Sequence, residues 1–169
     1  MRGLRREKID LEQRQITVDH QVIGYGPSSW EVTEPKTKSG NRIIPISSKA
    51  HAAIVRTIAR AEQENFSATV DGLTGFIVLG HQGSILNRSS FCRILKEICN
   101  EYNNEYGTEI KVTLHVLRHT FCTNMYHKGV SALSLQYVMG HTDLTTTMNV
   151  YTHNSPTKAL DELRKIVNQ

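Results

Sequence analysis

The 169-residue sequence contains no apolar run close to the roughly 18 residues that a membrane-spanning helix needs. Its first six residues, MRGLRR, include three arginines and no apolar stretch, so we expect no secretion signal. Internal repeats and low-complexity tracts are also absent. With 38% hydrophobic and 21% charged residues, the composition excludes a disordered, collagen-like or coiled-coil chain and suits one globular domain.

Cysteine is scarce: there are three, Cys92, Cys99 and Cys122, and no C-x-x-C pair. An odd number without metal-binding spacing argues against a disulfide framework or a zinc knuckle. We therefore expect a protein of the reducing cytoplasm.

Charge is unevenly distributed along the chain. Residues 1–60 carry a net charge of +5, residues 61–110 carry −4 and residues 111–169 carry +3. Five of the eight histidines lie between His115 and His153, a stretch whose one acidic residue is Asp143. Such a stretch offers hydrogen-bond donors to an anion with little competition from carboxylates. The total of +4 hints at a polyanionic partner without identifying it.

The first third of the sequence predicts a small β-sheet. Alternating β-formers indicate strands over 15–22, 30–33 and 42–46, separated by Gly-Pro and Lys-Ser-Gly-Asn turns. We expect these three strands to form one antiparallel meander with lysines at a hairpin tip. Trp30 is expected to pack on this sheet, and residues 76–79 to form a short buried strand or extended piece.

The remainder predicts helices. The first runs from Ser47 or Ser48 to about residue 65, and the second opens at Ser89 or Ser90 with an apolar side. Further helices are expected over 113–128, 131–139, 143–153 and from 155 onward. The predicted fold is α+β: mostly helical, with a small antiparallel three-stranded sheet at one edge.

One constellation carries chemistry: His115, Arg118, His141 and Tyr151. His115 and Arg118 are three residues apart and share a helix face, while Gly140 ends a helix just before His141. A guanidinium grips two phosphate oxygens and an imidazole donates to another, which suits a phosphodiester gaining charge at phosphorus. A tyrosine nucleophile needs a base, for which His115 is available.

The leaving sugar oxygen needs a proton donor, and a lysine at the hairpin tip would serve. Lys36 and Lys38 both qualify by position.

The motifs KTKSGNRIIPI (36–46), LRHTF (117–121) and MGHTDLTTTMNVYTH (139–153) resemble the catalytic domain of tyrosine recombinases, the phage-integrase family, in the style of conjugative-transposon or prophage integrases. The resemblance runs over nearly all 169 residues. It implies a site-specific recombinase that cuts and rejoins DNA without metal or ATP.

The resemblance also implies residue roles. Tyr151 would attack DNA to leave a 3′-phosphotyrosyl link, with His115 in acid–base work. Arg118 and His141 would hold the phosphate. The family pattern favours Lys36 over Lys38 as the donor to the leaving oxygen. Lys38, Arg5 and Arg6 are expected to contact DNA.

The sequence departs from the family at its start. Residues 4–10, LRREKID, match the stretch that follows the family's first catalytic arginine, so that arginine would fall before Met1. We therefore expect residues 1–169 to be a truncated C-terminal catalytic domain, weakly active or inactive alone, without the family's N-terminal DNA-gripping domains. In a longer protein, a homotetramer on DNA is expected, with residues 155–169 docking on a neighbour.

Other interpretations remain open. His115 and His119 have the spacing of a metal-binding pair, but His119 is expected to be a buried, hydrogen-bonded helix residue. The chain as a whole could instead be a non-catalytic DNA-binding or interaction module derived from the same fold. A type IB topoisomerase shares the chemistry, although the spacing from His141 to Tyr151 favours a recombinase.

Overall fold

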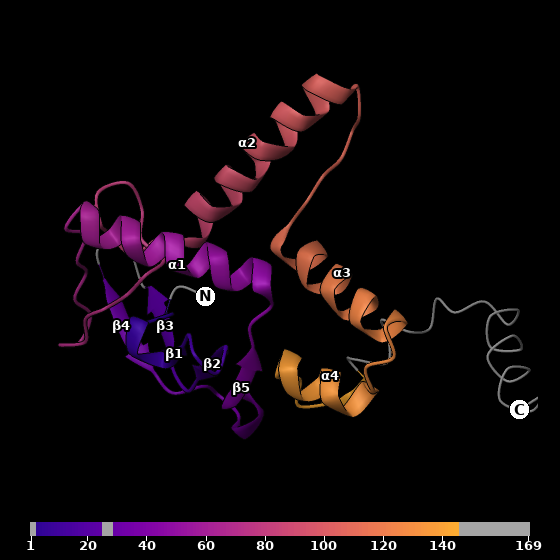
Figure 1. The fold of residues 1–169 in the computed structure, drawn as a ribbon, viewed down its shortest axis with the longest axis horizontal. Helices are drawn as coiled ribbons and strands as arrows, with labels where there is room; N and C mark the ends of the chain where they lie inside the picture. The colour runs from indigo at the N-terminus through magenta and orange to yellow at the C-terminus, as the bar shows by residue number, and fades with distance from the viewer. Residues whose placement is uncertain (1–2, 25–28, 146–169) are drawn as a thin grey trace, which may run out of the picture. The chain divides into compact units, whose positions relative to one another are not determined.

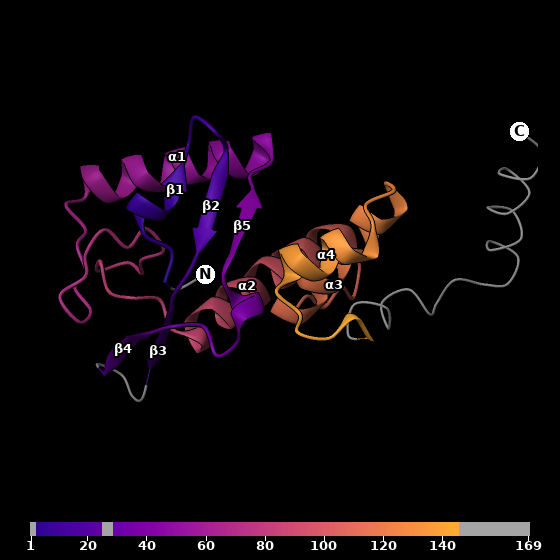
Figure 2. The ribbon, with the colours of Figure 1, turned by 90° about the horizontal axis from the view of Figure 1, so that it is seen from below.

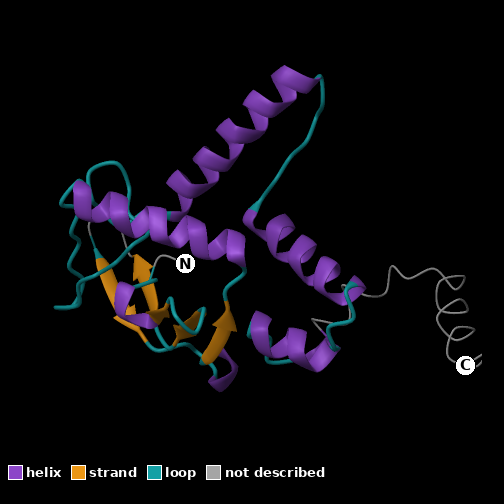
Figure 3. Ribbon diagram, in the orientation of Figure 1, coloured by secondary structure: helices purple, strands orange, loops and turns teal. Residues whose placement is uncertain are grey.

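The computed structural model describes residues 3–24 and 29–145. The chain divides into two compact units, Met1–Leu114 and His115–Gln169 (Figure 1). Helices and strands are distinguished in Figure 3. None of the helices in the described ranges is long and apolar enough to cross a membrane.

The first unit contains two small antiparallel sheets. Strands β1 (Ile9–Asp10), β2 (Gln15–Val18) and β5 (Arg42–Pro45) form one in the order β1-β2-β5, with Ile16 paired to Ile9 on one side and Ile44 on the other. Strands β3 (Gln21–Gly24) and β4 (Trp30–Thr33) form the other.

The single meander predicted from the sequence is therefore wrong in its pairing. The expected strand over 15–22 is interrupted at Asp19 and His20, whose side chains bind Lys8 and the Gly3 carbonyl. The interruption separates β2 from β3. As a result, a three-stranded sheet does exist, but it consists of β1, β2 and β5.

Helix α1 (Ser48–Gln63) covers the three-stranded sheet (Figure 2). Ser47 caps it by accepting a hydrogen bond from the Ala50 amide, as the sequence predicts. Its Ile54 and Ile58 pack against a buried cluster of Ile9, Ile46 and Ile77. The cluster joins the helix to the sheet and to the chain that follows.

A second cluster lies against the two-stranded sheet. It contains Val22, Val70, Phe76 and Ile85, and Trp30 packs against it as expected. The residues around 76–79 form an extended piece, with isolated bridges from Phe76 to Arg5 and from Leu79 to Ile85. Trp30 also covers Gly24, where an added Cβ would lie 2.6 Å from the indole ring.

Helix α2 (Arg88–Tyr106) begins slightly earlier than predicted. Its cap is Asn87, whose side chain accepts from the Ser90 amide at 2.7 Å, because an Asn side chain offers the same acceptor as a serine. It ends at Gly107 in the left-handed conformation. No residue of α2 is buried, and Ile98 on its apolar side is 56% exposed.

Helices α3 (Leu114–His127) and α4 (Ala132–Met139) follow the predicted helices closely. They lie side by side in both Figure 1 and Figure 2 and share a buried cluster of Cys122, Leu135 and Met139. Ser131 caps α4. Residues 144 and 145 are helical after Asp143, while the rest of that predicted helix and the one expected from 155 lie outside the described residues.

The fold is thus α+β and mostly helical, as predicted. Two short 3-10 helices, η1 (Arg6–Lys8) and η2 (Lys38–Gly40), complete the secondary structure of the described residues. Along these residues the order of elements is η1, β1, β2, β3, β4, η2, β5, α1, α2, α3 and α4.

Candidate functional site

Arg118 is held at the C-terminal end of α4. It projects from α3, and its Nη2 donates a hydrogen bond to the Met139 carbonyl, the last residue of α4. Carbonyls at the end of a helix lack intrahelical partners and carry the negative end of the helix dipole, so a guanidinium is a favourable partner there. The contact fixes the Arg118 guanidinium at Met139, which lies two residues before His141 in the sequence.

The backbone around His141 is shaped by Gly140. Gly140 has φ of 67°, a left-handed conformation that glycine adopts without a steric cost. Its amide donates to the Tyr137 carbonyl at 3.0 Å, and the His141 amide donates to the Gln136 carbonyl at 3.1 Å. This pair of bonds is a Schellman motif. The chain therefore turns sharply at the point where Arg118 is anchored, and it places His141 immediately after the turn.

Partial burial affects the guanidinium. Burial lowers the pKa of Arg118 from its ordinary value, and the nearby Cys122 acts in the opposite direction. An arginine remains charged at neutral pH even so. A partly desolvated cation interacts more strongly with an anion than a fully solvated one does.

His115 lies near the start of α3, in the same unit. Its Nε2 is 2.7 Å from the Nε2 of His119, one helical turn later, and the rings meet edge to face with centroids 4.3 Å apart. His119 is hydrogen-bonded as predicted, but it is exposed and not buried. The i, i+4 spacing was the signal in the sequence that could have identified this pair.

Carboxylates are scarce around these donors. The acidic residue in the described part of this unit is Asp143, and it is engaged by the Thr145 amide at 2.9 Å and the Thr145 hydroxyl at 3.0 Å. Those bonds lower the pKa of the Asp143 carboxyl, the backbone bond contributing most. Within residues 115–145, the one carboxylate therefore already has hydrogen-bond partners of its own.

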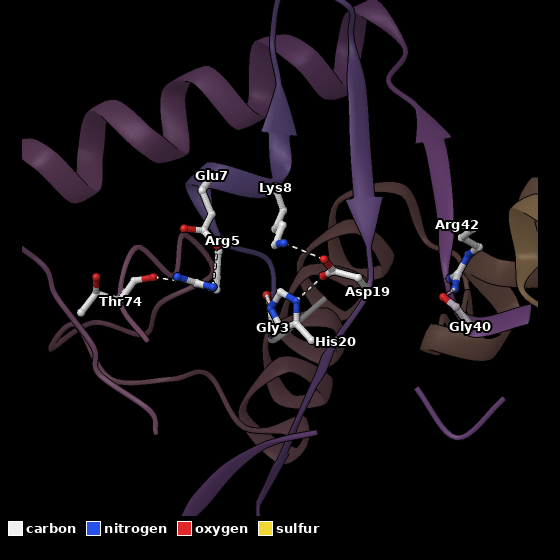
Figure 4. Close-up of polar contacts among 9 residues, drawn as sticks. All are labelled: Gly3, Arg5, Glu7, Lys8, Asp19, His20, Gly40, Arg42 and Thr74. Carbon is white, nitrogen blue, oxygen red and sulfur yellow. Dashed lines mark hydrogen bonds and ion pairs between the residues drawn. The ribbon is translucent and has the colours of Figure 1, made fainter. Parts of the chain in front are cut away.

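The two candidate lysines lie in the turn between β4 and β5, in the other unit. Lys36 and Lys38 are both exposed, and Lys38 opens the short helix η2. The turn is tightly closed, because a Cβ on Gly40 would lie 2.2 Å from the Pro35 Cβ. Arg42 also donates to the Gly40 carbonyl at 2.9 Å, which fixes the same turn (Figure 4). The lysines therefore extend from an ordered base.

Arg5, predicted to contact DNA, is instead 8% exposed. Its Nε donates to the Thr74 carbonyl at 2.8 Å, its Nη1 is 2.6 Å from Glu7, and it lies over the Phe76 ring (Figure 4). Burying a charged group requires partners of this kind. Arg5 therefore joins the start of the chain to the loop at 74–76, and the DNA-contact interpretation does not extend to it.

Arg6 is exposed, and its Nη1 donates to the Ile9 carbonyl at 3.1 Å. Nearby, Lys8 donates to Asp19 at 2.6 Å, and Asp19 is 2.6 Å from His20 Nδ1 (Figure 4). Burial raises the pKa of the Asp19 carboxyl, but the bonds from Lys8 and His20 together lower it below the ordinary value. This network explains the break between β2 and β3.

The predicted site residues are divided between the two units. His115, Arg118 and His141 belong to the unit of α3 and α4, whereas Lys36 and Lys38 belong to the other unit. Tyr151 lies outside the described residues, as does the 155–169 segment. Within the described ranges, no group of three or more His, Cys, Asp or Glu side chains is arranged to hold a metal ion.

The protein therefore carries an anchored guanidinium and the imidazoles of His115 and His141 within one helical unit. Its sequence matches the model of the phage integrase family over residues 1–158, so the chain belongs to that family.

Similar proteins include transposases and recombinases. The transposase from transposon Tn916 of Enterococcus faecalis is 31% identical over 165 residues, covering 97% of this chain and 40% of the relative. Tyrosine recombinase XerD of Listeria monocytogenes is 41% identical over 78 residues, covering 46% of this chain and 25% of the relative. The chain thus spans less than half the length of these curated relatives.

Solved structures share the fold. The Tn1549 transposon integrase in complex with transposon right end DNA superposes with a TM-score of 0.86 at 29% identity, covering 98% of this chain and 53% of that chain. XerA recombinase, at 20% identity and a TM-score of 0.67, covers 97% of this chain and 50% of that chain and supports the fold alone. The fold is that of a tyrosine recombinase catalytic domain.

Proposed function

We propose that this chain is the catalytic domain of a site-specific DNA recombinase that cuts and rejoins DNA through a 3′-phosphotyrosyl intermediate. The observation that carries the proposal is Arg118 anchored at the end of α4, next to the turn that positions His141, in a unit with few carboxylates. Donors held in place before charge develops at phosphorus lower the barrier, since they need no reorganisation during the reaction.

In the proposed reaction, His115 takes the phenolic proton of Tyr151. The phenolate oxygen bonds to phosphorus while the bond to the 5′-oxygen breaks. Arg118 and His141 neutralise the charge on the non-bridging oxygens, and Lys36 gives its proton to the departing 5′-oxygen. The phosphotyrosyl link conserves the energy of the phosphodiester, so the reverse attack by a 5′-hydroxyl reseals the strand.

The DNA contacts proposed outside this site come from Arg6 and Lys38, both exposed in the structure. In a longer protein we propose a homotetramer on DNA, with residues 155–169 docking on a neighbouring subunit. The relatives' structures determined with DNA support the choice of partner.

The 169-residue chain by itself is proposed to cleave slowly or not at all, and to act as the truncated C-terminal domain. The match covers 40% of the length of the Tn916 transposase, so a longer protein could supply further donors to the site. Loss of one preorganised donor costs roughly 10²–10³ in rate. A missing donor would also fit the alternative, a non-catalytic DNA-binding or interaction module that keeps the fold.

The test is covalent trapping on a nicked duplex whose cleavage releases a short fragment that cannot religate. The unaltered chain is compared with Tyr151→Phe, which keeps the ring and removes the nucleophile. An adduct formed by the first and not the second supports the enzyme. DNA binding with no adduct, both from this chain and from a longer protein that supplies the family's first arginine, supports the non-catalytic module.

The lysine assignment has its own test, a substrate with sulfur in place of the bridging 5′-oxygen. A thiolate leaves without a proton donor, because a thiol is far more acidic than an alcohol. Lys36→Ala should therefore lose cleavage of the oxygen substrate and recover it with sulfur. Lys38→Ala is the matched control, and rescue of Lys38→Ala in place of Lys36→Ala would reverse the assignment.

A further inference from the structure

The imidazoles of His115 and His119 form a hydrogen-bonded pair on α3. Their Nε2 atoms are 2.7 Å apart and the rings are inclined at 84°. Both residues are exposed, and His119 is outside the three buried clusters of the described chain. Packing of His119 in a core therefore does not account for the contact.

A nitrogen–nitrogen contact this short restricts the protonation of both rings. In a neutral imidazole one nitrogen carries hydrogen and the other a lone pair. A bond between two Nε2 atoms needs a hydrogen on one and a lone pair on the other. When both rings are neutral, one of them must therefore carry its hydrogen on Nε2 and the other on Nδ1.

Either His115 or His119 can be the ring that donates from Nε2, and the chemistry of the site selects between these two arrangements. If Nε2 of His115 accepted the bond, its hydrogen would lie on Nδ1 and its lone pair would be occupied. If Nε2 of His115 donates, the Nδ1 lone pair remains basic. The second arrangement alone leaves His115 able to take a proton from the Tyr151 phenol.

We propose that His119 is a positioning residue for the cleavage reaction: it accepts a hydrogen bond from Nε2–H of His115 and so keeps Nδ1 of His115 as the basic nitrogen. This inference rests on the proposed function, and no contact between His119 and DNA is part of it.

The proton balance is simple. The phenolic O–H bond of Tyr151 breaks and an N–H bond forms at Nδ1 of His115, while the phenolate oxygen bonds to phosphorus. His115 is then an imidazolium, and its bond to the neutral His119 becomes a charge-assisted bond, which is stronger than the neutral one. His119 gains and loses no proton. It stabilises the state that follows proton transfer.

The test is nitrogen NMR of the histidine-labelled 169-residue chain, at a pH where the imidazoles are neutral. Protonated and unprotonated ring nitrogens give separate signals, so each tautomer is read directly. The expected result is hydrogen on Nε2 in His115 and on Nδ1 in His119. The opposite pair of tautomers, or an independent mixture in each ring, would overturn the proposal.

Two variants sharpen the measurement. His119→Gln keeps an acceptor and should preserve the His115 tautomer, whereas His119→Leu removes the acceptor and should release it into a mixture. His81→Gln, an exposed histidine in the other unit, is the control and should leave the His115 signals unchanged. An unchanged His115 tautomer in His119→Leu would count against the proposal.

Trapping kinetics separate this inference from the proposed function. His119→Leu should form the adduct on the order of 10 to 100 times more slowly, the size of effect found when the hydrogen-bond partner of a metal-binding histidine is removed, and His119→Gln should recover most of the rate. An adduct in the unaltered chain with equal rates in both variants would defeat the inference alone. The expected tautomers without any adduct, in this chain and in a longer protein that supplies the family's first arginine, would defeat the proposed function alone.

Discussion

The two units treat their charged side chains differently. In the first, two cations pair with carboxylates: Arg5 lies against Glu7, and Lys8 against Asp19. In the second, Arg118 is held by a backbone carbonyl and His115 by another histidine. Internal ion pairs serve structure, whereas donors positioned without nearby carboxylates remain able to neutralise a bound anion.

The units also differ in their cores. The first has two buried clusters with seven members between them, and the second has one cluster of three in its described part. The alignment of Arg118 with α4 therefore depends on few apolar contacts. We expect substitutions in the second unit to affect the site more directly than substitutions in the first.

The largest expected effect is on chemistry. Arg118→Ala should slow adduct formation by roughly 10²–10³, or about 3–4 kcal/mol in barrier, because the fixed donor to the phosphate is lost. Arg118→Lys keeps the charge without the fork and should remain strongly impaired. Single-turnover trapping measures both, and circular dichroism checks that α3 and α4 persist. A near-normal rate of adduct formation by Arg118→Ala would show that the cation of the second unit is no more important for the reaction than the ion-paired cations of the first.

The next effect is on the small core. Leu135 is 1% exposed, and Leu135→Ala should lower the free energy of unfolding by roughly 2–5 kcal/mol through lost burial and the cavity left behind. Urea unfolding followed by circular dichroism measures it. Leu133→Ala, at a 68% exposed position of the same helix, is the matched control and should change little. Equal losses in the two variants would contradict the buried cluster.

A smaller loss is expected at Arg5. Arg5→Met removes the bonds to Thr74 and Glu7 and the charge over the Phe76 ring, at a cost of about 1–3 kcal/mol. DNA affinity should be unchanged, since the side chain is buried. The neighbouring Arg6, which is exposed, is the matched comparison for Arg5. Arg6→Met should weaken DNA binding with little loss of stability. If Arg5→Met weakened DNA binding and left stability intact, the prediction that Arg5 contacts DNA would be correct after all.

The smallest effect concerns pH. The pKa of Asp19 is lowered in the folded protein, so the stability it adds is present above its unfolded value and is lost as pH falls through the folded value. Asp19→Asn should therefore flatten the acid limb of the stability curve. Asp10→Asn in the same unit is the control and should leave that limb in place. Unfolding midpoints collected from neutral to acidic pH show whether the two curves separate.

Helix boundaries were the best-predicted part of the fold. Ser47, Ser131 and Gly140 act through hydrogen bonds or backbone angles within a few residues, so their neighbours in sequence suffice to identify them. The strand pairing was not predicted, because β2 pairs with β5 across a long intervening segment. The burial of Arg5 likewise depends on Thr74, which is 69 residues away.

By itself, the sequence determined the helices, the spacing that sets His115 and Arg118 on one face of α3, and the family-like order of the motifs. These are short-range properties, decided by helix periodicity and by caps. The tertiary structure alone decided that Arg118 reaches the Met139 carbonyl, 21 residues further along the chain, and that Asp19 interrupts a strand. Such contacts form only when packing brings distant segments together, and no local pattern encodes which polar groups then meet.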